Sequence, residues 1–98
     1  MIISAMCNIV KERKNSVIGY ASVLLEDPKV DFKFTIKGIQ IMEIQDGIRF
    51  ITFPARKDSK AEDGYADICF PLNQETRNMI TKTVLDEFER KYGKTEIY

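Results

Sequence analysis

Two adjacent basic residues are the clearest candidates for binding chemistry in this chain. Arg56 and Lys57 follow Pro54, which is expected to end a strand, so both charged groups should face solvent in a loop. A pair of exposed cations is suited to the phosphates of a nucleic acid. The alternative is an ordinary solvated loop in which Asp58 partners these charges, as many exposed ion pairs do.

The residues needed for most enzyme chemistry are missing. The chain has no histidine, which removes the Ser/His and Cys/His nucleophilic pairs and nearly all catalytic zinc sites. Asp46, Asp63 and Asp67 are accounted for by turns or pairing, and no glycine-rich phosphate loop or metal-ligand spacing is present. We therefore expect no enzyme, no metal and no cofactor, and binding as the mode of action.

The two cysteines are not spaced as a metal clip. Cys7 and Cys69 lie far apart, each inside an apolar run. A disulfide between them is possible in principle, but two cysteines in a chain without an export signal favour reduced, buried thiols and a cytoplasmic location.

Other basic residues allow a functional and a structural interpretation. Lys29, Lys33 and Lys37 alternate on one face of a predicted strand, which fits a phosphate-binding stripe or, as we favour, its outward solvated face. Arg77 lies three residues before Ile80 and so within the apolar stripe of a predicted helix. We expect Arg77 to be structural, with Asp67 as its partner.

Hydrophobic periodicity defines the elements that must position these residues. Strands are predicted at 2–10, 17–25, 32–44, 48–53 and 65–70, and a polar loop at 55–64. Strand 17–25 is apolar on both faces, which indicates a central strand covered by the helix or by a partner subunit. The helix is predicted at 74–92 from an apolar stripe on one face. The stripe consists of Ile80, Val84, Leu85, Phe88 and Tyr92.

Five residues are expected to control the backbone locally. The apolar parity of the third strand shifts by one at Gly38, which a β-bulge there would correct. Asp46-Gly47 predicts a type I′ hairpin with positive φ at both residues. Asn73 is the expected N-cap of the helix, and Gly93 is the expected residue after its end.

These elements predict an α+β domain: an antiparallel twisted β-sheet of about five strands followed by a C-terminal α-helix. The 98 residues fit one domain, with the sheet in 1–71 and the helix in 74–92. Fifteen basic and fifteen acidic residues balance, so any polyanion must bind through a local cluster. A chain this short has a thin core, which favours a homodimer, and no run is long enough to span a membrane.

The order of several short motifs resembles the stage V sporulation protein G family, the bacterial septation regulators. The resemblance covers about residues 18–92 and rests on Ile36–Ile39, Asp46-Gly47, Phe53–Lys57, Asp63–Tyr65, Asp67–Pro71, Glu75–Arg77 and Ile80–Phe88. It implies a small dimeric protein that binds DNA, and in some members RNA, in sporulation, septation and cell division, and transcription regulation. Carried over, it implies nucleic-acid contacts by Arg56, Lys57, Arg77 and Lys82. The alternative is a protein-interaction module that modulates a partner without binding nucleic acid.

Overall fold

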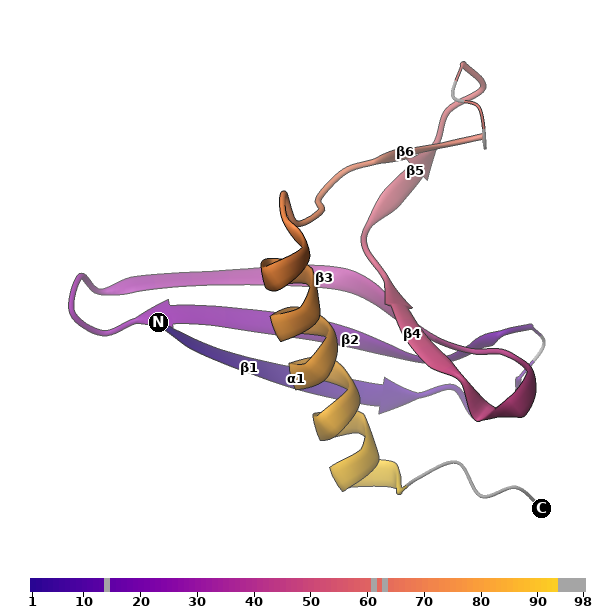
Figure 1. The fold of residues 1–98 in the computed structure, drawn as a ribbon, viewed down its shortest axis with the longest axis horizontal. Helices are drawn as coiled ribbons and strands as arrows, with labels where there is room; N and C mark the ends of the chain where they lie inside the picture. Colours follow the sequence, from indigo (N-terminus) through magenta and orange to yellow (C-terminus); the bar gives the residue numbers. More distant parts are fainter. Residues whose placement is uncertain (14, 61, 63, 94–98) are drawn as a thin grey trace.

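The chain folds into two antiparallel sheets and one long helix (Figure 1). A computed structural model describes residues 1–13, 15–60, 62 and 64–93. The elements are β1 (Ile2–Ile9), β2 (Val17–Asp27), β3 (Phe32–Glu43), the turn η1 (Gln45–Gly47), β4 (Arg49–Thr52), β5 (Ala55–Lys57), β6 (Tyr65–Asp67) and α1 (Gln74–Tyr92). This order confirms the predicted α+β class.

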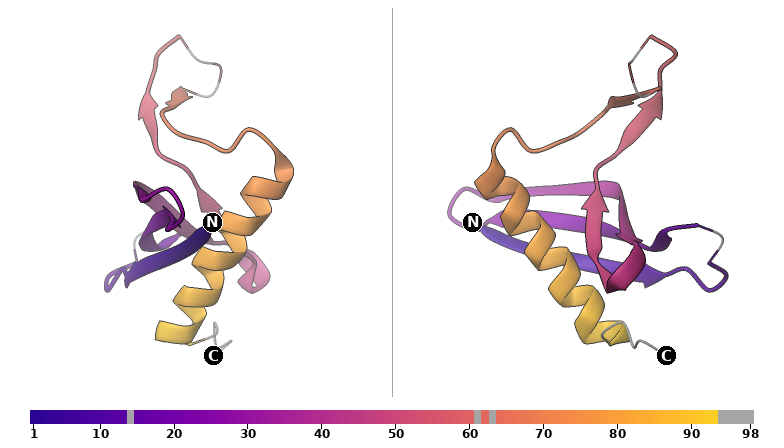
Figure 2. Two further views of the ribbon diagram at one scale, coloured as in Figure 1. Left: turned by 90° about the vertical axis from the view of Figure 1, so that its left-hand side faces the viewer. Right: turned by 45° about the vertical axis from the view of Figure 1, so that its right-hand side comes forward.

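The strands do not form the single sheet that was predicted. Strands β1 to β4 form one sheet in chain order, and β5 pairs only with β6. Residues 55–64 were expected to be a loop, but they begin with strand β5. The last strand, β6, ends at Asp67 rather than at Phe70. Proline has no N–H for a ladder, and the Pro54 carbonyl instead accepts bonds from the amides of Ile68 (2.9 Å) and Cys69 (3.4 Å). The β5–β6 hairpin therefore leaves the sheet as a projecting arm (Figures 1 and 2).

Helix α1 lies across one face of the four-stranded sheet and forms the core with it (Figure 2). Its N-cap is Asn73, whose Oδ1 accepts a bond from the Thr76 amide at 2.8 Å, as predicted. Gly93 follows the last turn with φ of 83°. The core consists of Cys7, Ile18, Ala21, Val23, Ile39, Ile41, Ile51, Phe53, Ile80, Val84 and Phe88.

The C-terminal end of α1 is bonded to β1 near the C-terminal end of that strand. Lys91 Nζ and Tyr92 OH both donate hydrogen bonds to the Cys7 carbonyl, at 2.8 and 3.3 Å. The Cys7 thiol in turn donates to the Val84 carbonyl at 3.6 Å. These bonds give the Cys7 carbonyl hydrogen-bond partners beside a side chain that is buried in the core.

Glycine allows the helix to approach β2 closely. A Cβ atom at Gly19 would lie 2.7 Å from Phe88 Cε1 and 2.7 Å from the Asn8 carbonyl oxygen. The Phe88 ring is itself held between the Tyr92 ring, whose centroid is 5.0 Å away, and the Arg49 guanidinium, 5.2 Å from the Phe88 centroid. No other residue type fits at position 19 without moving one of these groups.

The predicted bulge and hairpin turn are both present. Ala21 pairs with Ile39 but Val23 pairs with Ile36, so Ser22 alone faces both residues 37 and 38. Gly38 has φ of 85°, and the extra residue returns Ile36 to the helix-covered face with Ile39. In the next turn, Asp46 and Gly47 have φ of 67° and 72°, as a type I′ turn requires.

The face of the sheet opposite α1 is left open. Helix α1 covers only one side, so the expected cover on the second face of β2 is absent from the described residues of a single chain. Met6, Tyr20 and Phe50 are exposed large apolar side chains on this face, where Tyr20 is paired with Gln40 of β3. An open apolar sheet face is a surface available for binding.

Candidate nucleic-acid interface

Arg56 and Lys57 lie in strand β5 of the arm, not in a loop, and both are exposed. Arg56 is paired with Ala66 and Lys57 with Tyr65. Because successive side chains of a strand alternate, Arg56 and Lys57 point to opposite sides of the arm. Within the part of the chain that the structure describes, neither of them forms an ion pair.

The acidic residue next to this pair is engaged locally. Asp58 Oδ1 accepts a hydrogen bond from the Lys60 amide at 3.0 Å, and the Asp58 amide donates to the Gly64 carbonyl at 2.8 Å. The predicted alternative, in which Asp58 partners the two cations, is therefore wrong for the described atoms. Asp63, one of the carboxylates considered above, lies outside the described residues.

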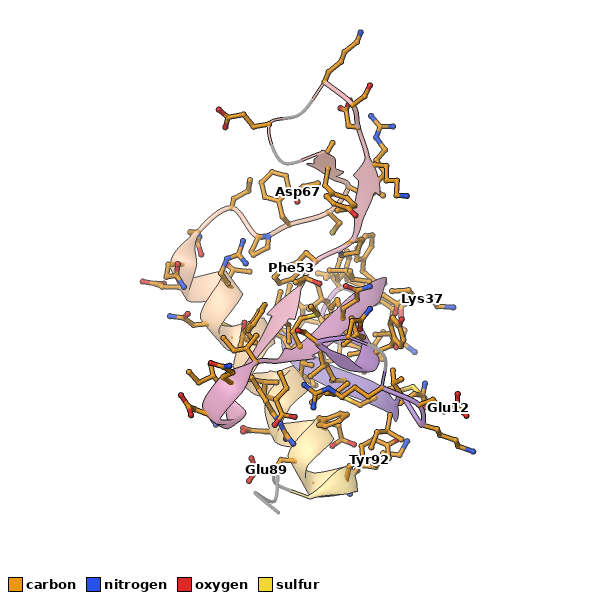
Figure 3. The ribbon with its side chains drawn as sticks, turned by 90° about the vertical axis from the view of Figure 1, so that its right-hand side faces the viewer. Glu12, Lys37, Phe53, Asp67, Glu89 and Tyr92 are labelled. Carbon is orange, nitrogen blue, oxygen red and sulfur yellow. The ribbon has the colours of Figure 1, made fainter. Side chains whose placement is uncertain are left out.

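Arg77 does not pair with Asp67, so that prediction is wrong. Its guanidinium lies over the Phe53 ring, 5.1 Å from the ring centroid. Figure 3 places Phe53 at the root of the arm and Asp67 farther out on the arm itself. Phe53 is only 9% exposed, so the guanidinium covers the edge of the core and gains a cation–π contact there. This geometry accounts for Arg77 as a structural residue.

Lys82 lies on the exposed side of α1 and is already paired. Its Nζ is 2.6 Å from Asp86 Oδ2, one turn along the helix. The hydrogen bond and the charge of Asp86 raise the pKa of Lys82 above its ordinary value. The four residues implied by the family resemblance therefore do not form one cluster: two lie on the arm, one at the start of α1 and one farther along it.

The predicted lysine stripe is interrupted. Strand β3 begins at Phe32, so Lys29 lies in the turn before the strand, and its amide donates to Asp27 Oδ1 at 3.1 Å. Lys33 lies directly opposite Glu26 in the register of β2 and β3, so an acidic residue is its cross-strand neighbour. Lys37 is different, because it lies at the bulge and points away from α1 (Figure 3).

A hollow of about 400 Å³ opens between the arm and the four-stranded sheet. Its floor includes Gln40 and Thr52, and the Thr52 hydroxyl donates to Gln40 Oε1 at 3.3 Å. Lys37 directly precedes Gly38 at the rim, and Lys57 is paired with Tyr65. The lining residues are Gly38, Gln40, Thr52, Phe53, Pro54, Ala55 and Tyr65.

Sequence reasoning missed this hollow. Gly38, Pro54 and Tyr65 were recognised only as a bulge, a strand stop and the start of a strand. The contact between the first two segments is visible only in the structure, where a Cβ at Gly38 would lie 3.7 Å from Pro54 Cγ. Nothing in the spacing placed Tyr65 beside them.

Other chemistry has little support among the described residues. No group of three or more cysteine, aspartate or glutamate side chains in 1–13, 15–60, 62 and 64–93 is close enough to hold a metal ion. Cys7 is buried, whereas Cys69 is half-buried rather than buried as expected. In the same residues, α1 is not apolar enough to cross a membrane.

Comparison with known families explains the motif order. The SpoVG family model matches residues 2–90. The chain belongs to the SpoVG family. A protein of Clostridium novyi named septation protein SpoVG is 38% identical over 80 residues, which cover 82% of this chain and 76% of that relative. No solved structure matches.

Two further SpoVG-named relatives match shorter stretches. The protein of Caldicellulosiruptor bescii is 43% identical over 56 residues, 57% of this chain and 60% of the relative. That of Caldanaerobacter subterraneus is 38% identical over 60 residues, 61% of this chain and 63% of the relative. In these two comparisons the chain spans somewhat over half of the relative's length. SpoVG membership thus ties the chain to septation and sporulation proteins.

Proposed function

We propose that this SpoVG-family chain is a nucleic-acid-binding regulatory protein of the septation and sporulation type, acting as a homodimer without catalysing a reaction. Its targets are DNA and, as a second class, RNA. The observation that carries the proposal is the exposed pair Arg56 and Lys57 on an arm that stands away from the sheet. Asp58 does not pair with them, because its carboxylate accepts a hydrogen bond from the backbone of its own loop.

A projecting arm suits contact with a phosphate backbone. Arg56 and Lys57 point to opposite sides of β5, so a nucleic acid that wraps or follows the arm meets a cation on each side. Because the whole chain is neutral, the attraction is local and short-ranged, and is weakened by salt.

The test replaces both arm cations by alanine. Binding of the double variant Arg56→Ala/Lys57→Ala to random duplex DNA and RNA is measured by gel shift at several salt concentrations. Affinity should fall for all sequences alike, and the slope of log affinity against log salt should fall by about one per lost phosphate contact. Folding stability should change little, because exposed charges contribute little to it.

Lys82→Ala and Arg77→Ala test the remaining contacts that the family resemblance implies. If Lys82 leaves Asp86 to bind a phosphate, its removal lowers the salt slope as well; Arg77→Ala should leave the slope unchanged, because its guanidinium is engaged over Phe53. The proposal would be refuted if Arg56→Ala/Lys57→Ala kept the wild-type slope of log affinity against log salt. It would also be refuted if the wild type bound neither DNA nor RNA at low salt.

The homodimer is supported by exposed apolar side chains outside the open sheet face. Phe32 and Phe34 are exposed and stacked, with ring centroids 6.3 Å apart and planes at 8°. Leu72, just before α1, is 90% exposed, and Phe70 and Met79 nearby are also exposed. Surfaces of this kind are commonly buried between subunits.

Sedimentation equilibrium at micromolar concentration should give about twice the 11.3 kDa chain mass. Leu72→Asp should shift the protein toward monomer while leaving its thermal unfolding almost unchanged, since the side chain makes little contact within its own chain. Monomeric wild type would contradict the homodimer.

The second candidate function is a protein-interaction module, favoured by the exposed Met6, Tyr20 and Phe50 on the open sheet face. Salt distinguishes the two functions. Phosphate contacts lose affinity steeply as salt rises, whereas an apolar interface does not.

A further inference from the structure

We propose that the hollow between the arm and the sheet binds one unstacked nucleobase of a single-stranded nucleic acid, with the base against Tyr65 and the flanking phosphates on Lys37 and Lys57. The inference rests on the proposed function, and it narrows the ligand to a strand whose bases are not paired.

The size and position of the hollow suit such a ligand. Its volume of about 400 Å³ lies within the range of roughly 300–1,000 Å³ that is typical of small-ligand sites. Bases in a duplex are stacked and paired, so only a base in a single strand, loop or bulge can enter a recess of this kind.

Tyr65 supplies an aromatic wall. It lines the hollow and is 54% exposed, so part of its surface remains open to a ligand. Aromatic side chains hold successive bases in single-strand-binding proteins, because every base offers a π face. Pro54 and Phe53 extend the apolar lining on the sheet side.

The floor supplies polar groups for a base edge. Gln40 and Thr52 are bonded to each other at 3.3 Å and both line the hollow. A glutamine amide both donates and accepts, and it can bond a base edge at two points. The hollow therefore combines an apolar wall with a polar floor, as nucleobase sites require.

Charge at the rim orients the strand. Lys57 lies directly across the ladder from Tyr65 and on the same side of the arm, and Lys37 projects beside Gly38 on the side away from α1. Among the paired residues of β5 and β6, Asp67, opposite Ala55, is the carboxylate on this side of the arm, and it lies nearer the root than Lys57. Phosphates are thus drawn to Lys57 on the arm and to Lys37 on the sheet, and are repelled by Asp67.

The experiment measures binding of fluorescein-labelled oligonucleotides of about ten nucleotides, within the site size of single-strand binders. Four probes are used: single-stranded DNA, single-stranded RNA, the DNA strand with abasic positions, and a DNA duplex. The variants are Tyr65→Ala and Tyr65→Phe. Ile48→Ala is the matched control. Ile48 is 55% exposed, like Tyr65, and it lies just before the start of β4, whereas the hollow lies at the other end of that strand, at Thr52.

Tyr65→Ala should weaken single-strand binding about 5- to 150-fold, the affinity equivalent of one stacked base. Duplex affinity and the salt slope should not change. Tyr65→Phe and Ile48→Ala should bind like wild type, and the abasic strand should bind wild type as weakly as the intact strand binds Tyr65→Ala. A 2-aminopurine placed in the strand should lose fluorescence on binding wild type but not Tyr65→Ala.

The outcomes separate the two proposals. If wild type binds single strands or duplex with a steep salt slope but Tyr65→Ala binds equally well, the nucleobase site is refuted and the proposed function stands. If wild type binds none of the probes at low salt, both are refuted. If Tyr65→Ala loses affinity equally for single-stranded DNA and RNA, the site recognises the base alone. If it loses affinity for only one of them, that strand is the one the site accepts.

Discussion

Adding one methyl group at Gly19 should loosen the junction between helix and sheet. In Gly19→Ala the new Cβ would lie 2.7 Å from both Phe88 Cε1 and the Asn8 carbonyl oxygen. Overpacking of this kind costs about 1–3 kcal/mol, and the reduced freedom of the unfolded chain recovers about 0.4–1 kcal/mol. We expect a net loss of about 1–2 kcal/mol, seen as a fall in the urea midpoint with an unchanged m-value.

The melting temperature of Gly19→Ala should fall by about 4–8 °C for each kcal/mol lost. The clash is assigned to the ring by a double-mutant cycle with Phe88→Leu, which shortens the side chain facing Gly19. Gly19→Ala should cost less in the Phe88→Leu background, because the shorter side chain leaves room for the methyl group. An equal cost in both backgrounds would place the strain at the Asn8 carbonyl alone, and no cost in either would refute the close approach.

Three further changes test other parts of the structure. Gly38→Val should cost about 1–3 kcal/mol through its φ of 85°, since a Cβ there would only touch Pro54 at 3.7 Å; unchanged thermal stability would contradict the bulge. Arg77→Ala should cost about 1 kcal/mol through the lost contact with Phe53, and a fall in the salt slope instead would make it a phosphate ligand. Burial, with a smaller effect of Glu87, raises the pKa of the Cys7 thiol. The folded state then holds the proton longer, so urea unfolding should show stability falling as pH rises above about 8.5, and falling less in Cys7→Ala.

Much of the fold could be predicted because it depends on local patterns. The apolar stripe with Asn73 and Gly93 gave the helix at Gln74–Tyr92, and the parity shift gave the bulge at Gly38. The arm could not be predicted, because Ala55–Lys57 carries no strand pattern of its own and Pro54 is equally consistent with a loop. Its pairing with Tyr65–Asp67 depends on a long-range contact.

The candidate site was predicted less well than the fold. Exposure of Arg56 and Lys57 followed from the sequence, but their opposite directions required the ladder register. Arg77 was expected to have a carboxylate partner, whereas its guanidinium lies over the Phe53 ring. The hollow joins residues from β3, β4 and the arm, and no spacing along the chain indicates that these three segments meet.

The bonds from Lys91 and Tyr92 to the Cys7 carbonyl have a consequence for synthesis on the ribosome. Lys91 and Tyr92 are separated from Cys7 by 84 and 85 positions along the chain, and they can meet it only after nearly all of the described chain has been made. Strands β1 to β3 can pair as soon as they emerge, but their apolar surface stays uncovered until α1, which carries Ile80, Val84 and Phe88 of the core, leaves the exit tunnel. Such delayed, long-range closure slows folding and prolongs the exposure of sticky surface. A stalled nascent chain lacking α1 should therefore be a preferred substrate for chaperones.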